Sequence, residues 1–125
     1  MVQICHELEQ KYAGSGLVIN RCEKQQDGTL LFPFIEGTSL EAYLDQCISK
    51  NDVTTFKDLI LEYKKLLSYR AEQNYCDYDF IFQNILISKN GWNLIDYEWT
   101  YEEVIPMKEI AYRAWYCFGI LGSSI

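Results

Sequence analysis

The chain has 125 residues, a formal net charge of −7 and a sequence pI near 4.6. Apolar residues make up 49% of it and aromatic residues 15%, which is enough for the core of one compact domain and excludes a disordered chain. The 11 basic residues form no run. We therefore expect no nucleic acid among its partners, because a phosphate backbone is usually bound by a basic stripe.

Cysteine and histidine usage limits the kinds of site. The five cysteines contain no C-x-x-C pair and are odd in number, which predicts reduced thiols and, with no signal peptide, a cytoplasmic location. His6 is the only histidine, which excludes a zinc site built on histidines. No apolar run reaches the roughly 18–20 residues that span a bilayer, so we expect a soluble protein.

The first third of the chain has the pattern of a helix followed by two strands. Apolar residues fall near one helical face over residues 2–12, and residues 13–16, Ala-Gly-Ser-Gly, end that helix. Short β-type runs cover residues 17–22 and 30–35. Asp27-Gly28 predicts a hairpin turn between these two runs.

Two helices are predicted next. Thr38 and Glu41 have the spacing of a capping box, in which each side chain accepts from the other residue's backbone N–H. The helix that follows is expected to end near Asn51, and a longer one to run from about Thr54 to Glu72. Apolar residues at three-or-four spacing give the second helix one buried face.

The last part of the chain predicts a hairpin and a helix. Two apolar runs flank Asn90-Gly91, a pair that tolerates positive φ at both turn positions. Pro106 suits the first turn of the final helix, on which Arg113 is expected to pair with Glu102 or Glu103. The order of helices and strands predicts an α+β fold in a single domain, residues 1–125.

Three polar residues have the spacing of a phosphoryl-transfer site. Asp79 and Asn84 form a D-x-x-x-x-N motif, and Asp96 ends the hairpin that follows. Phosphoryl transfer needs a carboxylate that takes the proton of the acceptor hydroxyl and oxygen ligands that hold Mg²⁺ against the phosphates. Each residue alone is also a common turn or strand-end residue, so the joint spacing carries the interpretation.

The segment "DFIFQNILI" followed by "WNLIDYEW" resembles the catalytic core of the aminoglycoside/choline phosphotransferase branch of the protein-kinase-like fold. It looks most like the kinase-like modules of bacterial enzymes of surface-polysaccharide assembly. The resemblance implies ATP and Mg²⁺ as cofactors, Asp79 as the catalytic base, and Asn84 and Asp96 as metal ligands. Glu98 falls on a position that is often acidic in that family.

The same resemblance extends upstream. The segment LLFPFIEG, residues 30–37, is similar to the last N-lobe strand and hinge, where the backbone around Phe34 and Glu36 would meet adenine. Residues 1–37 would then be an N-lobe remnant and hinge, with Val2–Tyr12 as the regulatory helix, and residues 38–125 a truncated, mainly helical C-lobe.

Three departures argue for a fragment with little activity alone. Asp77 stands where the family has His, and the sequence has no Gly-rich phosphate loop and no strand lysine with a partner Glu. The first hypothesis is therefore a phosphotransferase module acting on a hydroxyl of a sugar or related small molecule. The second is a non-catalytic, kinase-like interaction module of a polysaccharide-biosynthesis protein.

Two further expectations concern ligands and assembly. A calcium loop is disfavoured, because the alternating oxygen ligands and central glycine of an EF-hand are missing. Truncation of the C-lobe would leave Phe118, Ile120 and Leu121 uncovered, and large exposed apolar patches tend to become interfaces. We therefore expect a homodimer through the C-terminal helix.

Overall fold

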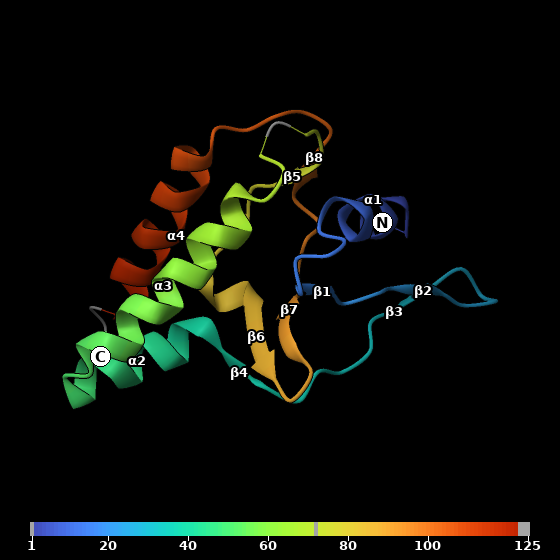
Figure 1. The fold of residues 1–125 in the computed structure, drawn as a ribbon. Coiled ribbons are helices and arrows are strands. Elements are labelled where there is room, and N and C mark those ends of the chain that lie inside the picture. Colours follow the sequence, from blue (N-terminus) through green and yellow to red (C-terminus); the bar gives the residue numbers. More distant parts are fainter. Residues whose placement is uncertain (1, 72, 123–125) are drawn as a thin grey trace.

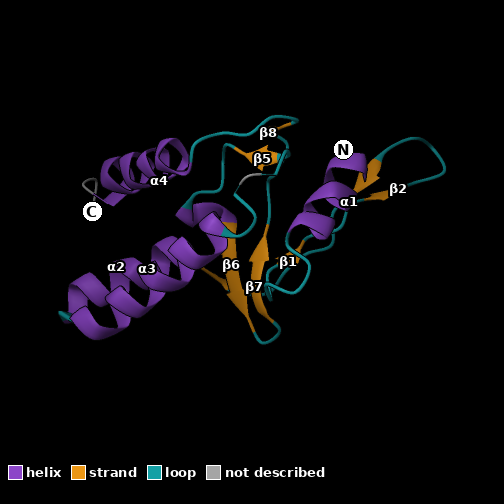
Figure 2. Ribbon diagram, turned by 45° about the horizontal axis from the view of Figure 1, so that its top comes forward, coloured by secondary structure: helices purple, strands orange, loops and turns teal. Residues whose placement is uncertain are grey.

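A four-stranded sheet at the centre of the molecule has helices on both sides (Figures 1 and 2). The computed structural model describes residues 2–71 and 73–122, and the side chains of residues 3–71 and 73–119. The described residues form a mixed α+β fold, as the sequence predicts. Its elements are α1 Val2–Lys11, β1 Val18–Ile19, β2 Glu23–Lys24, β3 Leu30–Leu31, β4 Thr38–Ser39, α2 Leu40–Lys50, α3 Val53–Ser68, β5 Cys76–Asp77, the 3-10 turn η1 Phe82–Asn84, β6 Ile85–Ser88, β7 Gly91–Leu94, β8 Thr100–Tyr101 and α4 Met107–Gly122.

The central sheet has the strand order β1-β7-β6-β4. The hairpin β6–β7 forms its middle, β4 pairs antiparallel with β6, and β1 pairs parallel with β7. α1 and the projecting β2–β3 hairpin lie on one side of the sheet, and α2, α3 and α4 lie on the other (Figure 1). The sheet therefore separates the N-terminal segment from the three longer helices.

Aromatic side chains fill much of the core between the helices and the loop that precedes β6. The ring of Tyr63 on α3 stacks on Phe80 at 5.3 Å between centroids and meets Phe82 edge-on at 4.9 Å. The buried hydroxyl of Tyr63 donates to the carbonyl oxygen of Phe80 at 2.6 Å. α3 thus holds the loop at both the side chains and the backbone.

The prediction that residues 17–22 and 30–35 pair with each other is wrong. β1 covers only two residues and joins β7, and the hairpin is formed by β2 and β3. Its turn is the predicted one, since Gly28 has φ +88° and the Asp27 carboxylate accepts from the N–H of Thr29 at 3.0 Å. In a tight hairpin the residues next to the turn pair with each other. The polar residues Glu23 and Lys24, and not the apolar run before them, therefore form the first strand of this hairpin.

The capping box predicted at α2 is also wrong. Ser39 is the N-cap, and its hydroxyl accepts from the N–H of Ala42 at 3.1 Å. Thr38 lies in β4 instead, paired with Ile87. Pairing with β6 keeps Thr38 extended and moves the start of the helix one residue further along. α2 ends as predicted, with Asn51 in the left-handed conformation at φ 56°.

α3 ends earlier than predicted, at Ser68, while Glu72 lies outside the described residues. Two features stop the helix. The hydroxyl of Tyr69 donates to the carbonyl oxygen of Ala13 at 2.7 Å, and Arg70 has a positive φ of 49°. A tertiary contact with the segment after α1 therefore sets this boundary.

The turn of the β6–β7 hairpin is placed one residue before the predicted pair. Ser88 pairs with Gly91, so Lys89 and Asn90 form the turn, and Gly91 alone of the predicted pair has positive φ, at 111°. The buried Asn93 amide determines this register, because its Nδ2 donates to the carbonyl oxygen of Gly91 at 2.9 Å and to Oδ1 of Asn90 at 3.1 Å.

An apolar stripe on α4 packs against α3 and η1. Pro106 directly precedes the helix, and its carbonyl oxygen accepts from the N–H of Glu109 at 3.0 Å. Ile110, Ala114 and Phe118 are buried. The prediction of an uncovered Phe118 is therefore wrong, because its ring packs edge-on against Phe82 at 5.6 Å. The side chains of Ile120 and Leu121 lie outside the described residues.

None of the helices in the described part of the chain combines the length and apolar character needed to cross a membrane.

Candidate functional site

The short strands β5 and β8 bring the two predicted site loops to one place. Cys76 pairs with Tyr101 and Asp77 with Thr100, just before the loop that carries Asp79 and just after the one that carries Asp96. A further backbone bond joins the N–H of Tyr78 to the carbonyl oxygen of Trp99 at 3.0 Å. Because β5 precedes the first loop and β8 follows the second, their pairing joins the two ends of the segment that contains both loops and the hairpin β6–β7.

Asp79 and Asn84 are linked directly. The side-chain Nδ2 of Asn84 donates to the backbone carbonyl oxygen of Asp79 at 3.0 Å. The same carbonyl accepts from the N–H of Ile81 at 2.7 Å, and η1 follows at Phe82. The five-residue spacing therefore curls the loop around one turn. Because Nδ2 is the donor in this contact, the amide oxygen Oδ1 of Asn84 is left to act as an acceptor or ligand.

Asp96 lies at the end of the hairpin that begins next to Asn84. Ile95 donates its backbone N–H to the carbonyl oxygen of Asn84 at 2.9 Å, so Asp96 directly follows a residue bonded to Asn84. Asp96 is exposed and has a positive φ of 51°. Asp is one of the few residues other than glycine that adopt this left-handed conformation, and such positions gather at functional sites.

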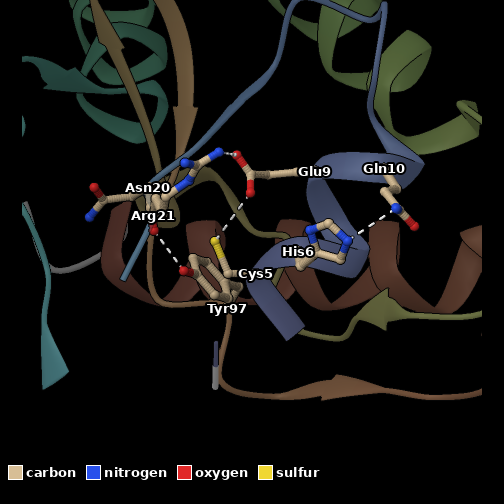
Figure 3. A network of polar contacts seen from close by, with 7 residues as sticks. All are labelled: Cys5, His6, Glu9, Gln10, Asn20, Arg21 and Tyr97. Atoms are coloured by element: carbon tan, nitrogen blue, oxygen red, sulfur yellow. Dashed lines mark hydrogen bonds and ion pairs between the residues drawn. The ribbon is translucent and has the colours of Figure 1, made fainter. Parts of the chain in front are cut away.

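A buried tyrosine anchors the backbone beside Asp96. The hydroxyl of Tyr97 donates to the carbonyl oxygen of Asn20 at 2.6 Å, next to the ion pair of Arg21 with Glu9 at 2.8 Å (Figure 3). In Figure 3 the Tyr97 ring lies beside Cys5 of α1, and its hydroxyl points to the segment after β1. The N-terminal part of the chain therefore fixes the loop that carries Asp96.

Asp77 is a buried acid beneath the loop. Its Oδ1 accepts from the N–H of Asp79 at 3.0 Å, whereas its buried Oδ2 has no partner among the described residues. Burial, with smaller contributions from the charges of Asp79 and Asp96, raises the pKa of Asp77 to about 8.

Arg113 contacts Asp79, which the sequence did not suggest. Its Nη2 and Nε lie 2.7 and 2.8 Å from Oδ1 of Asp79. The predicted pairing with Glu102 or Glu103 is therefore wrong. The bond to Asp79 raises the pKa of Arg113 above its ordinary value. One signal was available: Arg113 flanks the apolar stripe of α4, where a charge close to the core needs an opposite charge.

The residues predicted to meet a nucleotide lie along the neighbouring surface. Phe34 and Asp96 both line a pocket of about 370 Å³, whose other walls come from Asn20, Phe32, Pro33, Ile35, Leu86 and Ile95. Glu36 lines a separate, larger pocket of about 670 Å³, which also borders Phe34 and the turn of the β6–β7 hairpin. Phe34 thus connects the predicted hinge with the predicted metal ligand Asp96, and Glu36 faces the hairpin turn.

Two residues at this end of the hairpin carry oxygen atoms that could hold a magnesium ion. Asn84 offers an amide oxygen and Asp96 an exposed carboxylate, and the described residues contain no group of three or more His, Cys, Asp or Glu side chains that could hold a metal. Magnesium is commonly held by one or two protein ligands together with water and substrate phosphates. Asn84 and Asp96 are therefore the residues that would hold such an ion.

Comparisons with protein-family models, with curated proteins and with solved structures gave no significant match.

Proposed function

We propose that the chain is a kinase-like phosphotransferase module, a fragment with little activity alone, from an enzyme that transfers the γ-phosphoryl group of ATP to a hydroxyl of a sugar or related small molecule. The observation that carries the proposal is the joining of three residues of the motif. Asn84 bonds to the Asp79 backbone at 3.0 Å, and its own carbonyl accepts from the residue before Asp96 at 2.9 Å. Residues that are 17 positions apart in sequence, from Asp79 to Asp96, thereby share one end of the hairpin.

Each residue has a role that its chemistry allows. Asp79 orients the acceptor hydroxyl and takes its proton, and Asn84 and Asp96 bind Mg²⁺ through oxygen. When bound, Mg²⁺ offsets the charge that develops on the phosphates. The pocket of about 370 Å³ next to Asp96 has mainly apolar walls that include Phe34, which suits the flat base of the nucleotide. The backbone around Glu36, in the same segment of residues 30–37, would contact the adenine.

The family resemblance also suggests in which biological process the module acts. We infer a role in the assembly of a bacterial surface polysaccharide, with a sugar acceptor. A cytoplasmic location agrees with this role, because ATP is a cytoplasmic phosphoryl donor and all five cysteines are free thiols.

Nucleotide binding tests the proposal directly. A ligand that binds only the folded chain raises its stability, by about 2.7 kcal/mol at 100 times its Kd. We expect ATP with Mg²⁺ to raise the melting temperature, Mg²⁺ alone to have little effect, and Asp96→Ala to abolish the rise. Asp58→Ala, which removes an exposed carboxylate on α3, serves as the control and should behave as wild type. No shift with wild type would refute the proposal.

A non-catalytic interaction module is the second candidate, and two specific observations favour it. The carboxylate of Asp79 is already held by Arg113 at 2.7 Å, and the acid Asp77 stands at the family's histidine position. In this case the Asp79–Arg113 pair would stabilise the fold, and the chain would bind neither ATP nor magnesium. The same thermal-shift experiment therefore separates the two candidates.

A further inference from the structure

The side chain of Arg113 is fixed from two directions. On one side its Nη2 and Nε lie 2.7 and 2.8 Å from a single oxygen, Oδ1 of Asp79. On the other side its guanidinium carbon lies 4.7 Å from the centre of the Tyr78 ring, a cation–π contact. The Tyr78 ring in turn meets Tyr101 edge-on at 6.5 Å. Arg113 therefore connects α4 with the strand pair β5–β8 and with the loop.

These contacts leave a single atom of Asp79 available. Its N–H donates to Asp77 at 3.0 Å, its carbonyl oxygen accepts from Asn84 at 3.0 Å, and its Oδ1 is held by Arg113. Among the described residues, Oδ2 is the one polar atom of Asp79 with no hydrogen bond, and the Asp79 side chain remains 15% exposed. The carboxylate is therefore held by one oxygen and free at the other.

We propose that Arg113 is the positioning residue of Asp79: by holding Oδ1, it directs Oδ2 toward the acceptor hydroxyl. A carboxylate rotates freely about its last side-chain bond unless one oxygen is fixed, and a base that is misplaced by about 1 Å can cost a factor of about 10² in rate. The planar guanidinium suits this task better than a lysine amine, because it offers donors in a fixed geometry and stacks on an aromatic ring.

This proposal rests on the proposed function, in which a phosphoryl group passes from ATP to the acceptor oxygen. The acceptor oxygen forms a bond to the γ-phosphorus of ATP while the bond between that phosphorus and the β–γ bridging oxygen breaks. The electron pair of the broken bond leaves with ADP. The proton of the acceptor hydroxyl moves to Oδ2 of Asp79 and later passes to water. Arg113 takes no proton and contacts only Oδ1.

Three variants of the 125-residue chain test the role. Water is the acceptor, and because the module alone has little activity the readout is the slow release of radiolabelled phosphate from Mg·ATP. Arg113→Ala should lower kcat by about 10²-fold and leave KM and the calorimetric Kd for Mg·ATP unchanged. Arg113→Lys should lower kcat less, and added guanidinium ion should restore part of the turnover of Arg113→Ala. The control is Lys57→Ala, which removes an exposed positive charge on α3; it should keep wild-type turnover.

A second readout does not depend on turnover. In the NMR spectrum the Nε–H of Arg113 should exchange with solvent more slowly than that of the more exposed Arg21, and Asp79→Asn should speed its exchange. Wild-type kcat in Arg113→Ala, a change in KM in place of kcat, or no rescue by guanidinium would each overturn the positioning role.

The outcomes also separate this inference from the proposed function. A chain that binds and turns over Mg·ATP while Arg113 exchanges rapidly refutes the inference alone. A chain that binds no Mg·ATP refutes both, and calorimetry identifies that case whatever the state of Arg113. A chain that binds Mg·ATP, keeps Arg113 ordered and releases no phosphate overturns the positioning role and the phosphoryl transfer in the proposed function, while nucleotide binding stands.

Discussion

At the scale of single residues, burial changes the acidity of Asp77. Loss of solvent raises the pKa of Asp77 to about 8, and the charges of Asp79 and Asp96 act in the same direction. The N–H of Asp79 and the charge of Lys11 act in the opposite direction. Lys11 is itself buried, and its Nζ lies 3.5 Å from the sulfur of Cys76. Asp77 is therefore a neutral hydrogen-bond partner of the loop at neutral pH.

This pKa makes stability depend on pH. An unfolded aspartate has a pKa of about 3.9, so between about pH 4 and pH 8 the folded chain holds a proton that the unfolded chain has lost. The free energy of unfolding should therefore fall as pH rises through this window, with a limiting slope of about 1.4 kcal/mol per pH unit from this one group.

We expect Asp77→Asn to flatten that dependence. Asparagine is a neutral isostere of the protonated acid, and its Oδ1 can still accept from the N–H of Asp79. The test is urea unfolding of wild type and variant at several values between about pH 5 and pH 8. Asp58→Asn, an exposed carboxylate on α3, should keep the wild-type slope. Parallel curves for wild type and Asp77→Asn would show that Asp77 does not titrate in this range.

At the scale of elements, the start of α2 results from competition between a helix cap and a strand. Gly37 leads into β4 so closely that a Cβ there would lie 2.8 Å from the carbonyl oxygen of Ile87. Only glycine allows this approach, which lets Thr38 pair with Ile87 in the sheet. Ser39, the last residue of β4, pairs with Leu86 and also caps the helix that begins at Leu40.

Truncating each hydroxyl residue separately tests this boundary. Ser39→Ala should cost about 1 kcal/mol of stability, because an N-cap residue satisfies a backbone N–H of the first helical turn. Thr38→Ala should cost less, because its side chain makes no cap contact among the described residues. Urea unfolding of both variants measures the difference. A larger loss for Thr38→Ala would support the capping box that the sequence predicted.

At the scale of the whole molecule, the apolar surface of α4 is divided between core and exterior. Ile110, Ala114 and Phe118 are buried, whereas the rings of Tyr112 and Tyr116 are exposed and stack at 6.3 Å between centroids. If the chain dimerises through the C-terminal helix as predicted, the exposed rings of Tyr112 and Tyr116, and not the buried Phe118, would form the interface. The net charge of −7 opposes association at low salt, since like charges repel.

We expect light scattering to show a mass that rises with concentration, and more steeply at high salt, because salt screens the repulsion. Tyr116→Lys should reduce this association by placing a charge in the aromatic surface. Leu61→Lys, at an equally exposed apolar position on α3, adds the same charge elsewhere and should have little effect. A monomer at all concentrations would refute the predicted dimer.

The sequence by itself determined the features that depend on neighbouring residues. The helices beginning near residues 2, 40, 53 and 107 follow from apolar spacing and end signals, and the β6–β7 hairpin follows from two apolar runs around a turn. The spacing of Asp79, Asn84 and Asp96 belongs to this class as well, since one short loop and one tight hairpin bring these residues to the same end. Local backbone geometry is enough for all of these.

Only the tertiary structure decided the contacts between distant segments. Arg113 and Asp79 are 34 residues apart, so no local pattern could choose Asp79 over Glu102 or Glu103. The pairing of β1 with β7, the burial of Asp77 and the early end of α3 depend likewise on which surfaces meet. The sequence therefore identifies candidate site residues, while packing decides which oxygen of Asp79 is held and which remains available.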